Sequence, residues 1–142
     1  MLNTLLEGLS LVDQDTCEII MSKCGEACAN EDFWGPAVDI AERISEEEND
    51  VEKILERANN EISWCGKWIN HGDRIESTCR ECGCLLVKNG LVTRTEIFCY
   101  CSKGWVKTIF DTLLKKPVRV ELEKALGFDD DECRYVVFVE PE

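Results

Sequence analysis

The sequence predicts an α+β fold in which N-terminal helices pack on an antiparallel sheet that is interrupted by one helix. Before about residue 63, apolar residues recur at the spacing of helices, and after it they mostly alternate as in strands. We therefore expect a single domain over residues 1–142, mainly helical over 1–63 and built from a sheet and a helix over 64–142. A chain of 142 residues can bury such a core without cross-links.

Three helices are expected in the first part. The first carries an apolar stripe at i, i+3, i+4, i+7 and i+11: Cys17, Ile20, Met21, Cys24 and Cys28. Gly25 weakens this helix by up to about 1 kcal/mol. A short helix is expected from Pro36 to Ile44. The third helix has Asn49 or Asp50 as its N-cap, and its apolar side consists of Val51, Ile54, Leu55, Ala58 and Ile62.

The second part is expected to contain strands, turns and one helix. "WCGKWI" and "RIEST" flank a turn at His71-Gly72-Asp73. Asn89-Gly90 between "CLLVK" and "LVTRTEIF" predicts a β-hairpin, because a type I′ turn needs two residues with positive φ. Ser102 is expected to cap a helix that stops at Lys115-Lys116-Pro117. "VRVEL" and "CRYVVFV" are expected strands, joined by a turn in "GFDDDE".

Ten cysteines are the most unusual feature of the composition, and five of them lie within residues 78–101. A two-residue turn at Asn89-Gly90 would place the cysteines of both arms on one face of the hairpin. Cys79 and Cys82 have the C-x-x-C spacing at which two thiolates bind Zn²⁺ at about 2.3 Å. Cys84 adds a third thiol, as in many iron–sulfur sites. The candidate metal ligands from this segment are Cys79, Cys82, Cys84, Cys99 and Cys101.

Two other interpretations of these thiols stay open, namely burial as small apolar side chains and redox pairing. For Cys17, Cys24 and Cys28, which share a helix face with apolar residues, core packing is favoured, and Cys65 is expected in the core as well. His71 is the only histidine. A histidine-rich hydrolytic zinc site is therefore excluded, and we find no G-x-S-x-G and no glycine-rich phosphate motif.

The net charge of −13 argues against nucleic-acid binding and against attraction to an acidic membrane surface. No apolar run approaches the roughly 18 to 20 residues of a membrane span. The start of the sequence lacks the basic region and cleavage site of a secretory signal. A cytoplasmic protein with reduced thiols is thus expected. The alternative, a chain that has lost a signal peptide, would be a disulfide-framed interaction domain outside the cell.

Roughly residues 96–139 resemble the closing segment of the 4-vinyl reductase domain family. The family pattern runs from a cysteine and a Gly-aromatic pair through a helix, a valine-rich strand with Glu and an acidic turn after Gly to Cys-x-aromatic. The matching positions here are Cys99, Gly104-Trp105, Val118, Val120, Glu121, Gly127, Asp130 and Cys133-Arg134-Tyr135. The resemblance implies a fold similar to the ligand-binding fold of nitric-oxide signalling and Golgi transport proteins. Short uncharacterised bacterial and archaeal proteins, and proteins described as thiazoline-carboxylate hydrolases, look similar over the same stretch.

In zinc-containing members of that family, a cysteine at each end of the segment and another late in the strand hold the metal, helped by an upstream acidic residue. The end cysteines fall on Cys99 and Cys133, whereas the middle one falls on Ala125. The usual site therefore cannot form unchanged. Cys101, or a thiol among Cys79, Cys82 and Cys84, is the candidate replacement.

The resemblance implies a cytosolic module that binds a small apolar or aromatic ligand and carries a structural metal, with zinc first and an iron–sulfur cluster as the alternative. Candidate pocket walls, each of which is also a candidate core residue, are Trp64, Trp68, Phe98, Trp105 and Phe110. A second hypothesis is a small-molecule hydrolase or reductase that uses Cys99, Cys101 or a metal-activated water. A thiolate just ahead of a helix capped by Ser102 would have a lowered pKa. A homodimer is left open.

Overall fold

The computed structural model describes every residue except 32–34, 65, 82–83, 94 and 142. The described residues form an α+β fold, which confirms the predicted class. The helices are α1 (Leu2–Leu9), α2 (Gln14–Asn30), α3 (Ala37–Glu47), α4 (Val51–Glu61), α5 (Leu85–Lys88), α6 (Glu96–Leu114) and the 3-10 helix η1 (Leu126–Phe128). The strands are β1 (Ile69–Asn70), β2 (Ile75–Cys79), β3 (Val118–Lys124) and β4 (Cys133–Val139).

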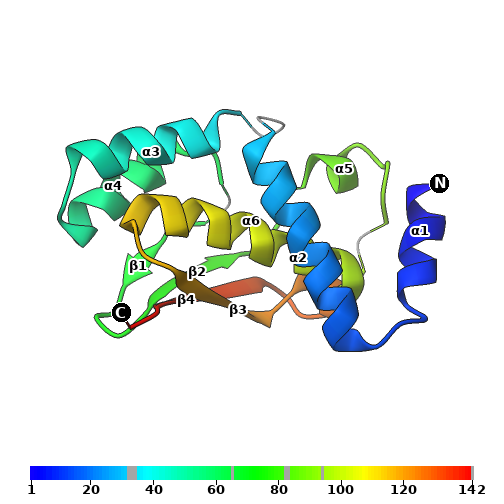
Figure 1. Cartoon of the computed structure of the whole chain (residues 1–142). Coiled ribbons are helices and arrows are strands. Elements are labelled where there is room, and N and C mark those ends of the chain that lie inside the picture. The colour runs from blue at the N-terminus through cyan, green and yellow to red at the C-terminus, as the bar shows by residue number, and fades with distance from the viewer. Residues whose placement is uncertain (32–34, 65, 82–83, 94, 142) are drawn as a thin grey trace.

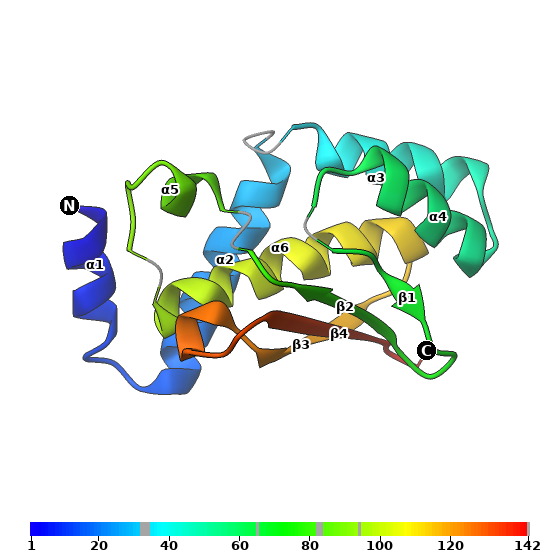
Figure 2. The same cartoon turned by 180° about the vertical axis from the view of Figure 1, so that it is seen from behind.

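The four strands form one antiparallel sheet in the order β1-β2-β4-β3. Helix α6 lies along one face of this sheet, and α2 and α3 pack on α6 (Figures 1 and 2). The main core lies between these layers, where Phe110 and Ile109 of α6 and Val137 of β4 are fully buried. Helix α6 is therefore the central element, and it contacts both the sheet and the N-terminal helices.

Several predicted elements are confirmed where a polar cap or turn reinforces the apolar pattern. Helix α4 begins after Asp50, whose Oδ1 accepts a hydrogen bond from the Lys53 N–H at 3.2 Å. The β1–β2 turn contains Gly72 with φ +93°, as the His71-Gly72-Asp73 turn requires. The strands predicted from "VRVEL" and "CRYVVFV" are β3 and β4. Helix α3 follows Pro36 and ends three residues beyond the predicted Ile44.

The predicted helix around Cys17 is confirmed as α2, but its predicted buried stripe is partly wrong. Cys17 and Met21 are buried, whereas Ile20 and Cys24 are exposed. The buried face continues from Met21 through Gly25 and Ala29 instead. After Met21, each buried position therefore lies one residue later than the apolar pattern predicts, at Gly25 and Ala29 instead of Cys24 and Cys28.

Glycines explain the rotation of α2, because they let its backbone meet that of α6. A Cβ built on Gly25 would lie 1.7 Å from the Cys101 carbonyl oxygen, and one built on Gly104 would lie 1.8 Å from the Ser22 carbonyl oxygen. Only glycine fits such approaches. Gly25, which lowers the intrinsic helix propensity, thus fixes the crossing of the two helices.

The predicted hairpin at Asn89-Gly90 is wrong, because these residues end helix α5. The Gly90 N–H donates to the Val87 carbonyl oxygen at 3.0 Å, and the Leu91 N–H donates to the Leu86 carbonyl oxygen at 2.9 Å. This pair of bonds is a Schellman motif, which needs the positive φ of Gly90 (+72°) at the position after the C-cap. An Asn-Gly pair suits both motifs, and a short apolar run such as "CLLVK" does not distinguish a strand from a helix.

The predicted start of the long helix at Ser102 is also wrong. Helix α6 begins at Glu96, after Thr95, whose side-chain oxygen accepts a hydrogen bond from the Phe98 N–H at 3.3 Å. Cys99 and Cys101 therefore lie within the helix and not ahead of its N-terminus. Thr95 stands directly before the first residue of the helix, as an N-cap does. It was not predicted as the cap because the expected hairpin placed this segment in a strand.

Candidate functional site

A pocket of about 470 Å³ lies between the helices at the N-terminal end of the chain and the sheet. Its walls come from α1, α2, α5, α6, the loop around Trp64 and the adjoining ends of β2 and β4. Most of the lining side chains are apolar. Ligand pockets usually measure 300–1,000 Å³ and have mainly apolar walls with a few polar groups. The size and lining of this pocket fall within that range.

Cysteines are the commonest residue type in the lining of this pocket. The structure describes eight of the ten cysteines, and all of these except Cys17 line the pocket. The lining cysteines are Cys24, Cys28, Cys79, Cys84, Cys99, Cys101 and Cys133. Five of the six predicted metal ligands are among them, and Cys82 lies outside the described residues. The two cysteine groups therefore meet as expected, although a helix and a loop bring them together instead of a hairpin.

The cysteines at the sheet end of the pocket form a cluster in which Cys79 and Cys133 are buried. Cys79 of β2 lies directly opposite Cys133 of β4 in the antiparallel ladder. Both pack on Ala125, which is fully buried, and Cys99 of α6 packs against the same cluster. The Leu126 N–H approaches the Cys133 sulfur at 3.4 Å. Cys79 thus lies beside the position at which the family resemblance expects a cysteine and this chain has Ala125.

The described donors do not by themselves make a metal site. Among the residues with described positions, no three side chains of His, Cys, Asp or Glu are close enough together to hold an ion. Cys79 takes part in a disulfide bond. His71 lies in the β1–β2 turn, where its Nε2 is 3.9 Å from a Glu76 oxygen, and it does not line the pocket.

The Cys101 thiol is held in its protonated form. Burial raises its pKa to about 12, and the neighbouring thiols of Cys28, Cys24, Cys84 and Cys99 add to the effect. A cysteine nucleophile reacts as the thiolate. The raised pKa therefore counts against Cys101 as a nucleophile at neutral pH.

Four of the five aromatic residues predicted to form pocket walls line the pocket. These are Trp64, Trp68, Phe98 and Trp105. The ring centroid of Trp64 is 5.3 Å from that of Trp68 and 6.1 Å from that of Trp105. Phe110 is fully buried and stacks on the other rings of the core, with its centroid 5.8 Å from that of Trp64, and it does not line the pocket.

The wall that α1 contributes was not predicted from the sequence. This wall consists of Leu2, Leu5, Leu6 and Leu9. These leucines follow the i, i+3, i+4, i+7 spacing of one helix face, so the signal was present in the sequence. The spacing alone does not indicate which partner this helix face covers.

Two polar side chains that line the pocket, Ser102 and Tyr135, are already hydrogen-bonded to each other. The Tyr135 hydroxyl donates to Ser102 Oγ at 2.9 Å, and Ser102 Oγ donates to the Cys99 carbonyl oxygen at 2.6 Å. This chain of bonds links β4 to α6 beneath the thiols. It fixes the geometry of the pocket floor.

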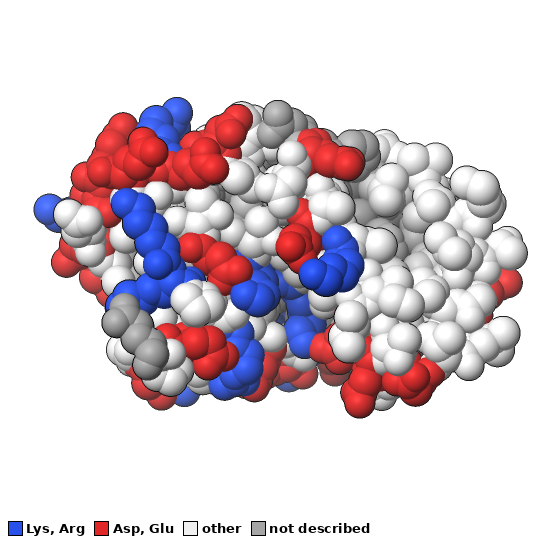
Figure 3. Space-filling view, viewed as in Figure 1, with Lys and Arg blue, Asp and Glu red and all other residues white. Residues whose placement is uncertain are grey.

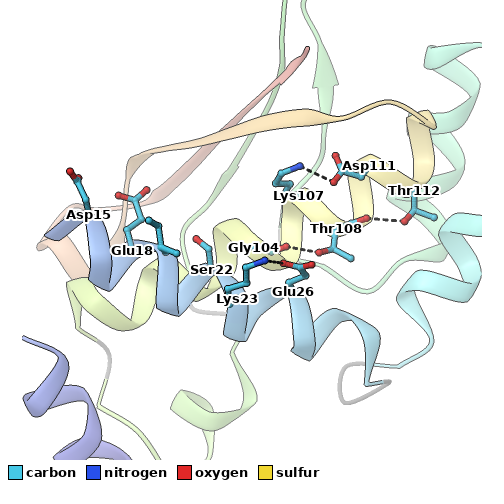
Figure 4. Close-up of a pocket in the computed structure, with 11 residues that line it drawn as sticks. Asp15, Glu18, Ser22, Lys23, Glu26, Gly104, Lys107, Thr108, Asp111 and Thr112 are labelled. Carbon is cyan, nitrogen blue, oxygen red and sulfur yellow. Dashed lines mark hydrogen bonds and ion pairs between the residues drawn. The ribbon is translucent and has the colours of Figure 1, made fainter. Parts of the chain in front are cut away.

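A second hollow, of about 760 Å³, follows the crossing of α2 and α6, and Figure 4 shows the side chains around it. Several of its charged groups are paired: Lys107 with Asp111 at 2.8 Å and Lys23 with Glu26 at 3.5 Å within their own helices, and Glu18 of α2 with Lys103 of α6. The Thr108 hydroxyl donates to the Gly104 carbonyl oxygen within α6. Because these polar groups already have partners, the first pocket is the better candidate site.

Comparison of the sequence with models of protein families gave no match, and comparison with curated proteins gave none either. The resemblance to the 4-vinyl reductase domain family therefore stays a prediction. In the described part of the chain, no helix combines the length and apolarity that a membrane crossing requires.

Proposed function

We propose that this chain binds a small apolar or aromatic molecule in the pocket of about 470 Å³ beneath α1. The observation that carries the proposal is the lining itself, in which leucines, cysteines and three indole rings surround one space. Burial of apolar surface contributes roughly 25 cal/mol per Å², so such walls favour an apolar guest. The proposed role is binding or sensing.

Thiol catalysis is less well supported by the same site. Cys101, one of the two candidate nucleophiles, keeps its proton at neutral pH because its pKa is raised to about 12. The other, Cys99, lies within α6 and not ahead of its N-terminus. The only histidine, His71, does not line the pocket as a base.

N-Phenyl-1-naphthylamine, a neutral aromatic dye that fluoresces in apolar surroundings, tests the binding proposal. We expect saturable binding of about one dye molecule per chain. Leu86→Trp, which adds bulk to a lining residue of α5, is expected to weaken binding at least about tenfold. Leu91→Trp is the matched control, because Leu91 is 60% exposed and does not line the pocket.

Circular dichroism of both variants would show that each keeps its fold. Absence of saturable binding to the parent chain would overturn the proposal. Equal binding by the Leu86→Trp and Leu91→Trp variants would show that the dye binds elsewhere and would overturn it as well.

A thiolate metal site is the second candidate, favoured by the packing of the partly buried Cys99 against the cluster that contains the buried Cys133. Thiolates suit zinc, whose structural sites need four ligands. The ion would tie α6 to the end of the sheet and so stabilise the fold. The described residues supply fewer than three grouped donors, so Cys99 and Cys133 are proposed only as two members of the set.

Elemental analysis after zinc loading under reducing conditions tests this second candidate. We expect about one zinc ion per chain, a substantial loss in Cys99→Ala and Cys133→Ala, and no loss in Cys17→Ala, whose thiol is buried elsewhere. Iron with visible absorbance after anaerobic purification would support the iron–sulfur alternative. Less than about 0.2 metal ion per chain would overturn both versions.

A further inference from the structure

Some residues that line the pocket are also exposed, and they mark its mouth. Leu2 and Leu5 of α1 line the pocket although they are 39% and 61% exposed. Opposite them, Ile20 of α2 lines the pocket and is 38% exposed, and Cys24 of the same helix is exposed as well. A side chain can do both only where the pocket meets the solvent. The mouth therefore lies between α1 and α2.

The α2 side of this mouth is fixed to the rest of the molecule. At the start of α2, Asp13 Oδ1 accepts a hydrogen bond from the Thr16 N–H at 2.9 Å, and Asp13 Oδ2 accepts one from the Thr16 hydroxyl at 2.7 Å. Gln14 Nε2 donates to the Tyr100 hydroxyl of α6 at 3.0 Å. Further along, the close backbone approach at Gly25 holds α2 on α6. The chain is thus anchored from Asp13 onward.

The α1 side of the mouth is attached at one end of the helix. Near its C-terminus, Leu6 and Leu9 pack against the buried cluster around Tyr100. None of the residues of α1 is buried, and its one hydrogen bond beyond the following turn, among the described residues, is from the Thr93 N–H to Asn3 Oδ1 at 3.0 Å. Helices as short as α1 are marginal on their own in water. The N-terminal end of α1 is therefore held weakly over the pocket.

The change from weakly held to anchored chain falls at residues 10–12, which join α1 to α2 at one end of the molecule (Figures 1 and 2). In this turn the Leu11 N–H donates to the Gly8 carbonyl oxygen at 3.1 Å, and the Val12 N–H donates to the Leu9 carbonyl oxygen at 3.2 Å. Leu11 is 87% exposed and Val12 is 43% exposed, so packing does not fix the turn. Hinges are often a few such residues at the end of an element.

We propose that α1 is a lid, which pivots at residues 10–12 and closes the mouth over a bound molecule. This inference rests on the proposed binding function and adds how access to the pocket is controlled. Without a bound molecule, closure brings Leu2 and Leu5 over an unfilled space and gains little apolar contact. With one, closure buries both side chains against it, which is favourable. Binding itself therefore shifts α1 towards the closed position.

Hydrogen–deuterium exchange read by mass spectrometry tests whether α1 opens by itself. In the ligand-free protein, we expect the amides of α1 to exchange at least about a hundredfold faster than those in the middle of α2, because α1 opens without global unfolding. Saturating N-phenyl-1-naphthylamine should slow the exchange of α1 at least about tenfold. The β1–β2 turn at residues 71–74 is the control, since none of its residues lines the pocket, and its exchange should stay unchanged.

Release of the dye, followed by stopped-flow fluorescence, tests whether α1 holds the bound molecule. Leu5→Ser removes an apolar contact of the lid, so the dye should dissociate at least about tenfold faster, while association changes by less than about threefold. Leu11→Ser is the matched control, because Leu11 is also an exposed leucine but does not line the pocket, and it should release the dye as the parent does. Neither substitution should lower the ligand-free Tm by more than about 3 °C.

Two results would overturn the lid and leave the proposed function intact. One is saturable dye binding with the same exchange of α1 in the free and bound protein, because α1 would then be a fixed wall. The other is an equal rate of dye release from the Leu5→Ser variant and the parent. Absence of saturable dye binding to the parent would overturn the proposed function and the lid with it.

Discussion

Individual residues decide the chemistry of the pocket through their surroundings. The Cys101 thiol lies half-buried on α6, and burial together with neighbouring thiols raises its pKa to about 12. A cysteine in the unfolded chain has an ordinary pKa of 9.0. The thiol is therefore harder to ionise in the folded protein than in the unfolded one.

This difference predicts a pH dependence of stability. Below about pH 9 the thiol is protonated in both states, and its contribution to stability is fully present. As the pH rises from about 9 towards 12, the unfolded chain ionises first, so the free energy of unfolding falls. Urea unfolding measured at several pH values in this window should show a smaller fall for Cys101→Ala than for the parent.

Cys24→Ala provides the comparison for this experiment, because Cys24 is an exposed cysteine on α2 that also lines the pocket. Its substitution should change the slope between pH 9 and 12 less than Cys101→Ala does, because Cys24 is only one of the smaller causes of the raised pKa of Cys101. If Cys101→Ala follows the same pH curve as the parent, Cys101 is not the group that burial protects from ionisation.

Residue types alone identified part of the site. Aromatic side chains at Trp68, Phe98 and Trp105 were expected to form walls, and they do line the pocket. Phe110 has the same chemistry but faces the core. Residue type cannot distinguish an aromatic side chain that lines the pocket from one that lies in the core. The difference depends on which neighbouring element covers each face of α6.

At the scale of elements, the crossing of α2 and α6 sets the shape of the molecule. The two backbones approach at Gly25 and Gly104, and the figures show α2 running across α6 (Figures 1 and 2). Side chains from both helices then diverge around the crossing. One of the resulting spaces is the pocket and the other is the polar hollow of Figure 4.

A methyl group at this crossing should force the helices apart. We expect Gly25→Ala and Gly104→Ala to lower the free energy of unfolding by about 1–3 kcal/mol each, because the added Cβ would overlap backbone atoms that cannot rotate away. Gly8→Ala is the matched control within a helix, since a Cβ there meets nothing within 4 Å. It should be neutral or stabilising by up to about 1 kcal/mol.

Thermal or urea unfolding of the three variants measures the difference. If Gly25→Ala and Gly104→Ala are as stable as Gly8→Ala, α2 and α6 are not in backbone contact. Weaker binding of N-phenyl-1-naphthylamine by the Gly25 and Gly104 variants would further show that the crossing shapes the pocket.

Elements with their own local signals could be predicted, and those without them could not. Asp50 caps α4, and Gly72 with its neighbours makes the β1–β2 turn, so both were found. Asn89-Gly90 led to a wrong prediction of a hairpin, because the positive φ of Gly90 belongs to the C-terminus of a helix here. That error carried over to the start of α6, since the same segment was assigned to a strand.

At the scale of the whole molecule, the α+β class followed from the change in apolar period, which each half of the sequence displays by itself. The pocket did not follow in the same way. Its walls come from six helices and strands that are distant in sequence, and only packing decides which of their faces meet. The sequence predicted a gathering of thiols but not the leucines of α1 opposite them.

Charge is also unevenly distributed over the molecule. In Figure 3, acidic and basic side chains crowd the end that carries α3 and α4, whereas the end near α1 and α5 is largely uncharged. Exposed apolar residues at this end include Leu2, Leu5, Leu11 and Val12. The pocket has walls from α1 and α5, the helices of this largely uncharged end, which suits a neutral guest.

Helix α1 has no fully buried residue, and the Asn3 side chain accepts one backbone hydrogen bond, from the Thr93 N–H at 3.0 Å. Its leucines form a wall of the pocket, so they touch whatever fills that space. Segments with few buried contacts open locally at small free-energy cost. A molecule bound in the pocket would therefore bury the leucines of α1. Because binding would stabilise the packed form of α1, the first residues of the chain would resist proteolysis only while that molecule stays bound.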